Sequence, residues 1–163
     1  MTAYITDTKS VMQQGEKMKK IIVSACLLGY NCKYSGSNNK NDAVLKLKNK
    51  YELIPVCPEE AGGLPTPRDA SEISNGKVVT NKGKDVTKEF TLGAEKCFEI
   101  AKNNNCNIAV LKERSPSCGF KKIYDGTFTS TIIDGNGIFA ELLDKNGVKI
   151  YNETNAEELL NDN

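Results

Sequence analysis

The residues in this sequence with the greatest capacity for chemistry are its cysteines. The chain has six Cys and no His, which excludes Ser-His and Cys-His nucleophile pairs, zinc sites with a histidine ligand and the usual general base near neutral pH. Any reaction must therefore use thiolates, carboxylates, hydroxyls, Lys or Tyr. Cys26, Cys57 and Cys118 stand where an apolar run meets Gly, Pro or Ser, as at the ends of strands. Cys97 and Cys106 stand in or beside apolar, periodic segments, where a free Cys packs as a small hydrophobe.

The first three of these cysteines have a common relation to the predicted strands. Apolar runs at 21–28, 52–57 and 107–113 predict buried strands, and each of the three cysteines ends or follows one of them. Parallel strands end at the same edge of a sheet, and ligands bind in the crevice beyond that edge. We therefore expect the three thiols to converge there.

Three thiols without a histidine are compatible with several kinds of site. A structural zinc ion takes four protein ligands, and an iron-sulfur cluster normally takes four as well. Cys32, in the loop after Cys26, would complete such a set. If only three thiolates bind, one metal position stays open to substrate, which favours catalysis. The residues alone leave open a catalytic cluster, a four-thiolate site and a role without metal.

Polar residues in the neighbouring loops supply further candidates. They are Glu59, Glu60, Arg68, Arg114, Ser115 and Ser117. The two carboxylates are candidates for proton transfer, and the two hydroxyls for hydrogen bonds to a ligand or a cluster sulfur. The two guanidinium groups are suited to hold an anion or to stack on a base. A purely structural interpretation is also possible. In it, the two adjacent Glu are solvent-exposed charges of a loop, and Ser-Pro-Ser is an ordinary turn.

The elements that must position these residues alternate between strands and helices. Besides the three strands, the pattern predicts a helix at 41–51, a loop at 58–69, a hairpin at 72–87, a long helix to about 103, a strand with turns at 123–137, a helix at 138–147, a strand at 148–153 and a short helix at 156–162. Asp85 or Thr87 is the expected cap of the long helix. This order predicts an α/β fold, a single-domain three-layer sandwich with a mainly parallel sheet and a small β-hairpin insertion.

Length and charge set outer limits on function. A chain of 163 residues has room for one domain, which we place at 18–163. Residues 1–17 are polar and lack a clear period, and we interpret them as a disordered or wrongly assigned N-terminal extension, with translation beginning at Met18. The net charge of +1 provides no field that draws nucleic acid to the whole surface, so no stable nucleic-acid binding is expected. No segment has the pattern of a signal peptide or a membrane span, so we expect a cytoplasmic protein.

Five segments of the chain carry a resemblance to a known family. They are VSACLLG (23–29), PVCPEEAGGLPTPRDASEI (55–73), DVTKEF (85–90), LKERSPSCG (111–119) and IYDGTF (123–128). In order and nearly in full they resemble the TudS-like thiouracil desulfidase family, and the resemblance spans about residues 20–150.

The resemblance implies a 4Fe-4S cluster held by Cys26, Cys57 and Cys118, with one open iron. That iron would take the sulfur of a thiolated pyrimidine such as thiouracil and release it as hydrosulfide, while water completes a non-redox replacement of C=S by C=O. One of the two adjacent Glu would handle the proton of the attacking water, and a Ser of the SPSC loop would orient the substrate or the departing sulfur. The implied partners are the small-molecule substrate and the iron-sulfur assembly machinery.

One loop departs from the family pattern. Many relatives have Arg-Tyr-Asp-Gly where this chain has Lys33-Tyr34-Ser35-Gly36, which leaves the identity of the substrate open. We interpret Cys32 as a non-ligand, because a fourth ligand would block the open iron. Two alternatives belong to other functional classes. One is a small Cys-metal binding module that acts as a zinc or redox sensor without catalysis, and the other is a cluster-free nucleotide-binding domain.

Overall fold

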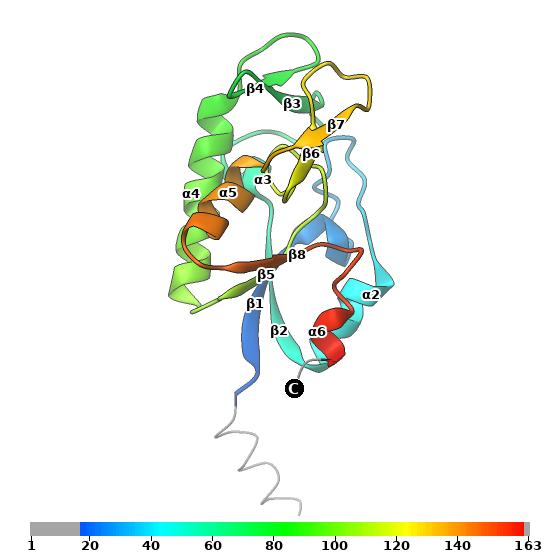
Figure 1. Ribbon diagram of the computed structural model, residues 1–163, viewed down its shortest axis with the longest axis vertical. Coiled ribbons are helices and arrows are strands. Elements are labelled where there is room, and N and C mark those ends of the chain that lie inside the picture. Colours follow the sequence, from blue (N-terminus) through cyan, green and yellow to red (C-terminus); the bar gives the residue numbers. More distant parts are fainter. Residues whose placement is uncertain (1–16, 162–163) are drawn as a thin grey trace, which may run out of the picture.

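Four parallel strands form the central sheet, in the order β2-β1-β5-β8 (Figure 1). They are β1 (Lys19–Ser24), β2 (Tyr51–Val56), β5 (Ile108–Val110) and β8 (Lys149–Tyr151). The computed structural model describes residues 17–161. The interpretation of 1–17 as an extension therefore falls, except for Lys17, outside the described residues, and the domain limits 18–163 stay a prediction.

The composition of the strands agrees with their places in the sheet. Ile21, Ile22 and Val23 of β1 are completely buried, as expected for a central parallel strand covered on both faces. In β2, Pro55 is in register with Val23. Proline has no N–H to donate, and β2 is an edge strand, so this residue leaves the ladder intact.

Helices cover both faces of the sheet. One face carries α4 (Thr87–Asn103) and α5 (Ile138–Lys145), and the other carries α2 (Asp42–Leu45), the 3₁₀ helix η2 (Lys46–Asn49) and α6 (Glu158–Asn161) (Figure 1). Separate apolar clusters fill the two spaces between the layers. The predicted three-layer α/β sandwich with a parallel sheet is confirmed. None of the helices within residues 17–161 has the length and apolar character of a membrane span.

Two hairpins lie beyond the carboxyl ends of the sheet (Figure 1). The predicted hairpin consists of β3 (Ser71–Ser74) and β4 (Lys77–Thr80), and both residues of its Asn75-Gly76 turn have positive φ, as a type I′ turn requires. The second pairs β6 (Lys122–Tyr124) with β7 (Ile132–Asp134). The prediction of one strand with turns for this segment was wrong, because the loop between β6 and β7 folds the chain back on itself.

Two of the strands predicted to lead to a cysteine, those before Cys26 and Cys57, are followed by helical turns. The strand predicted over 21–28 is too long, because its last four residues form the 3₁₀ helix η1 (Ala25–Leu28). The loop predicted over 58–69 begins as one helical turn, α3 (Pro58–Ala61), where the fixed φ of Pro58 suits the first helical position. Cys26 therefore lies on η1, and Cys57 is the N-cap of α3.

The remaining cysteines without a proposed chemical role belong to the core. Phe90, Ala94, Cys97 and Ala101 form the buried stripe of α4, and Cys106 joins the same apolar cluster as Cys97. Burial raises the pKa of Cys97 to about 12, so its thiol stays neutral. The prediction that these two cysteines pack as small hydrophobes is confirmed.

Two glycines bring α3 into direct backbone contact with α4. A Cβ atom at Gly93 would collide with the carbonyl oxygen of Pro58, and a Cβ atom at Gly62 would collide with the carbonyl oxygen of Glu89. Neither obstacle is a flexible side chain, so any side chain here must push the two helices apart. The position of α3, and with it that of Cys57, depends on this contact.

We expect Gly93→Ala to destabilise the fold by about 1–3 kcal/mol or more, because overpacking a tight contact displaces the backbone. The measurement is urea unfolding of the two proteins side by side. Thr91→Ala, an exposed position on the same helix, is the matched control and should leave the free energy of unfolding nearly unchanged. Equal stability of the two variants would contradict the close helix contact.

Candidate active site

A cavity of about 490 Å³ lies at the carboxyl edge of the sheet. Its wall includes Cys26, Cys57 and Cys118, so the structure brings together the three thiols that were expected to converge. Cys32 lines the same cavity. Within residues 17–161, no three Cys, Asp or Glu side chains are grouped as ligands of a single metal ion, and the three thiols instead belong to the wall of a larger space.

Cys26 and Cys57 are held by the turns that follow β1 and β2. The side chain of Asn39 forms a hydrogen bond with Cys26, whose pKa is nevertheless raised, mainly by burial. The Cys57 Sγ atom lies 3.9 Å from the Cys32 carbonyl oxygen, and the pKa of Cys57 is lowered, mainly by the neighbouring Cys32 side chain and also by the backbone N–H of Glu60. Cys57 therefore takes the thiolate form more readily than Cys26.

Cys118 is held by the start of α5. The first N–H groups of a helix have no partner within the helix, and here they donate to carbonyls of the SPSC loop: Ile138 N to Pro116 O at 2.8 Å and Phe139 N to Ser117 O at 2.9 Å. Just before the helix, Gly137 N donates to Gly119 O at 2.7 Å. Cys118 is thus flanked on both sides by anchored backbone. Burial raises the pKa of its thiol.

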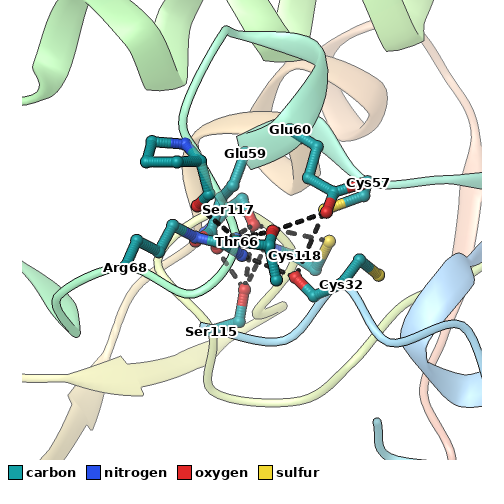
Figure 2. A network of polar contacts seen from close by, with 10 residues as sticks. Cys32, Cys57, Glu59, Glu60, Thr66, Arg68, Ser115, Ser117 and Cys118 are labelled. Carbon is teal, nitrogen blue, oxygen red and sulfur yellow. Dashed lines mark hydrogen bonds and ion pairs between the residues drawn. The ribbon is translucent and has the colours of Figure 1, made fainter. Parts of the chain in front are cut away.

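The Glu59 carboxylate is fixed at both oxygens. The Arg68 Nε atom donates to Glu59 Oε1 at 2.9 Å, and the Ser117 hydroxyl donates to Glu59 Oε2 at 3.1 Å. The side chains of Arg68 and Glu59 are only 7% and 16% exposed, so solvent screens this ion pair little. Ser117 Oγ also lies 3.6 Å from Cys118 Sγ. Figure 2 shows the resulting cluster of Glu59, Arg68, Ser117 and Cys118, which links a carboxylate to a thiol of the cavity through one hydroxyl.

The two Ser of the SPSC loop have different surroundings. The Ser115 hydroxyl accepts hydrogen bonds from Cys118 N at 2.8 Å and from Ser117 N at 3.1 Å, and it lies 3.1 Å from Ser117 Oγ. Ser115 thus shapes the loop and can donate its own proton to Ser117. Both residues line the cavity.

Glu60 and Arg114 are placed differently from their neighbours. The Glu60 carboxylate accepts a hydrogen bond from Thr66 Oγ1 at 2.5 Å, and the residue is not part of the cavity wall. Arg114 has a positive φ, forms an ion pair with the adjacent Glu113 and is itself not part of the wall. Of the Glu and Arg candidates that the sequence supplied, the structure therefore brings Glu59 and Arg68 to the cavity.

Arg68 connects the loops around the cavity. Besides Glu59, its guanidinium donates to Thr66 Oγ1 at 2.7 Å, to Pro65 O at 3.2 Å and to Cys32 O at 2.7 Å. These contacts occupy most of its five N–H donors. Arg68 thus fastens the Cys32 loop to the Glu59 segment, and it has little capacity left to hold an anion.

Comparison with known proteins gives matches that span nearly the whole of the described chain. A family described as 2-thiouracil desulfurase matches residues 21–155. The chain belongs to this family. An uncharacterized protein of Bacillus subtilis (strain 168), YbbK, is 39% identical over 150 residues, which cover 86% of this chain and 99% of that protein. The solved structure of a 4Fe-4S-dependent thiouracil desulfidase, TudS (DUF523Vcz), is 40% identical and superimposes with a TM-score of 0.81 over 87% of this chain and 95% of its own.

Membership of the 2-thiouracil desulfurase family confirms the resemblance seen in the sequence and the prediction of a desulfidase enzyme. The share of both chains covered by the TudS match also confirms the predicted fold class, since the two structures agree over nearly their whole length.

Several residues of this family member line the cavity but were not candidates for a chemical role in the sequence. They are Ser24, Tyr34, Asn39, Glu72, Lys112, Tyr124 and Phe128. Glu72 lies beyond α3 from Cys57, and Phe128 lies beyond β6 from Cys118, so only the fold brings these two to the cavity. Lys112, for example, forms an ion pair with Glu153, which lies in the segment after β8. The distance from Lys112 Nζ to Glu153 Oε2 is 2.6 Å. Glu72 alternates with half-buried neighbours on β3 and looks in the sequence like an ordinary hairpin residue.

Proposed function

We propose that this chain replaces the C=S group of a thiolated pyrimidine, such as 2-thiouracil, by C=O, and that it does so with a 4Fe-4S cluster held by Cys26, Cys57 and Cys118. The observation that carries the proposal is the placement of these three thiols, from three loops, in the wall of one cavity. Family membership and the 4Fe-4S-dependent relative support it.

The three residues fit such a cluster on chemical grounds. Thiolates are the usual ligands of iron-sulfur clusters. Burial is the main cause that raises the pKa of both Cys26 and Cys118, and nearby thiolate charge at Cys57 raises both further. Three uncompensated thiolates are therefore unfavourable in this cavity, and a cationic centre would offset their charge.

Held by these three cysteines alone, a cluster would supply one open iron, a Lewis acid with affinity for the soft sulfur of the substrate. For this reason we propose that Cys32 is not a ligand. Its backbone carbonyl accepts hydrogen bonds from Arg68 at 2.7 Å and from the Cys57 thiol at 3.9 Å. Cys32 would then help to fix the loop beside the ligand Cys57 without binding iron itself.

The proposed reaction requires no net transfer of electrons. Water attacks the ring carbon, its oxygen forms the new C=O bond, the C–S bond breaks, and the sulfur leaves with a proton as hydrosulfide. No oxidant or reductant enters. The step requires a group that accepts a proton from water and a group that holds the ring in place.

Glu59 is the proposed proton acceptor. It lines the cavity, its two oxygens are fixed by Arg68 and Ser117, and a positioned carboxylate is a common general base. Ser117 connects Glu59 to the Cys118 end of the cavity, where the sulfur of the substrate would leave. Ser115 supports Ser117. We place Glu60 outside this proton path, because its carboxylate is bound by Thr66.

We also propose that the enzyme is cytoplasmic and receives its cluster from the iron-sulfur assembly machinery. A free-thiol site that must acquire a cluster suits a reducing cytoplasm and the iron-sulfur assembly machinery. We retain both expectations, together with a single desulfidase domain at 18–163.

The test is product analysis with cluster-loaded protein prepared without oxygen. We expect 2-thiouracil in water labelled with heavy oxygen to give labelled uracil and an equal amount of hydrosulfide, with no added reductant. Failure to form uracil, or a requirement for reductant, would overturn the proposed reaction. Protein that binds zinc and has no turnover would favour the small Cys-metal module instead.

A further inference from the structure

Phe128 is an exposed aromatic residue in the wall of the cavity. It lies in the loop between β6 and β7, lines the same space as the three thiols, and remains 36% exposed. It belongs to none of the apolar clusters of the core. Core packing therefore does not account for this side chain.

A buried carboxylate fixes the loop that carries Phe128. Glu72 on β3 is only 9% exposed, and its Oε1 atom accepts hydrogen bonds from the backbone N–H groups of Gly126 and Phe128, both at 3.0 Å. The two hydrogen bonds join the β6–β7 loop to the other hairpin. Glu72 thus determines where the backbone of Phe128 lies.

The loop keeps an unfavourable backbone conformation at Phe128. Its φ is +59° and that of Ser130 is +60°. These values lie in the left-handed region, which residues other than Gly rarely adopt. A hydroxyl chain stabilises the loop: Thr129 Oγ1 lies 2.6 Å from Thr127 Oγ1 and 2.8 Å from Thr131 Oγ1. Such a conformation persists only where surrounding contacts determine it, so the fold specifies the backbone position from which the Phe128 ring projects.

We infer that Phe128 is the surface on which the pyrimidine ring of the substrate stacks, and that Glu72 is the positioning residue that holds Phe128 there. This inference rests on the proposed function. A planar ring held face to face cannot tumble, and its sulfur can then stay directed at the thiol end of the cavity. Stacking on an aromatic side chain tolerates any base, because every base has a π face.

The test compares Phe128→Ala with the native enzyme, both loaded with the cluster. We expect the KM for 2-thiouracil and the Kd for the product uracil, measured by calorimetry, to rise about tenfold or more, since stacking on an aromatic residue is worth roughly 1–3 kcal/mol per base. Phe128→Tyr keeps the ring and should restore both constants. Ile133→Ala, an exposed residue of β7 in the same hairpin that lies outside the cavity wall, is the matched control.

The role of Glu72 is tested by a double-mutant cycle. If Glu72 acts through Phe128, Glu72→Ala should raise the Kd for uracil about as much as Phe128→Ala, and the double variant should show no further rise. Glu72→Gln keeps an acceptor oxygen and serves as the variant that preserves the fold. Additive effects, or a Kd for Phe128→Ala within about twofold of native, would overturn the inference. Native enzyme that binds uracil but forms none from 2-thiouracil would instead count against the proposed function.

Discussion

Replacing Cys118 by Ala is expected to abolish turnover of 2-thiouracil and to leave the purified protein with little or no iron. The thiol is buried, and its loop is anchored by the start of α5, so no other side chain can take its place at that point of the cavity. If the three thiols hold the cluster as proposed, loss of one would leave it with two protein bonds, half the four cysteine ligands that such clusters usually have. Iron per chain and uracil formation, measured on the same preparation, check this prediction.

Three other cysteines provide the controls for this result. Cys97→Ala and Cys106→Ala remove core thiols and should each cost about 1 kcal/mol of stability, with iron and activity retained. Cys32→Ala should also retain iron if Cys32 is not a ligand. Iron loss in Cys97→Ala equal to that in Cys118→Ala, or full activity in Cys118→Ala, would contradict the assigned ligands.

Glu59→Gln is expected to lower kcat about 10²- to 10⁴-fold, the usual contribution of a general base, with iron content unchanged. The amide has nearly the shape of the carboxylate and still offers an oxygen to Arg68 or Ser117, so the loop should keep its place. It cannot take a proton from water. The measurement is the initial rate of uracil formation at saturating 2-thiouracil, with the iron content determined for each variant.

The adjacent residue is the matched control for Glu59. Glu60→Gln alters a carboxylate that binds Thr66 and should change kcat only by about twofold or less, as surface changes away from the reacting atoms usually do. If both variants lose activity to the same degree, the proton does not move by the path through Glu59. If Glu59→Gln loses iron along with activity, the carboxylate supports the cluster site and is not the base.

The features of the fold that follow from periodicity could be predicted from the sequence. The alternation of apolar runs and amphipathic segments was sufficient for the three-layer sandwich, and the Asn75-Gly76 pair for the first hairpin. The turns at Cys26 and Cys57 could not be predicted, because a single 3₁₀ or α turn has no period to detect. The β6–β7 hairpin was missed because its turn spans a loop in which Phe128 and Ser130, not Gly alone, have positive φ.

The candidate site could be predicted only where it adjoins a strand end. The thiols, Glu59 and Ser117 stand in such loops and were therefore found. The partners that decide their roles are long-range: Glu59 is fixed by Ser117 from 58 residues away, and the Phe128 loop is held by Glu72 from 56 residues away. These pairings depend on how the hairpins fold over the sheet edge, which no local pattern encodes.

The central claim is that three thiols hold a cluster whose open iron meets the sulfur of the substrate. Its most direct test is the visible absorption spectrum of protein purified without oxygen, recorded before and after addition of 2-thiouracil. We expect a brown protein with about four iron per chain, and a spectrum that changes when 2-thiouracil is added but not when uracil replaces it. Colourless protein, or an iron-sulfur spectrum that 2-thiouracil leaves unchanged, would contradict the claim.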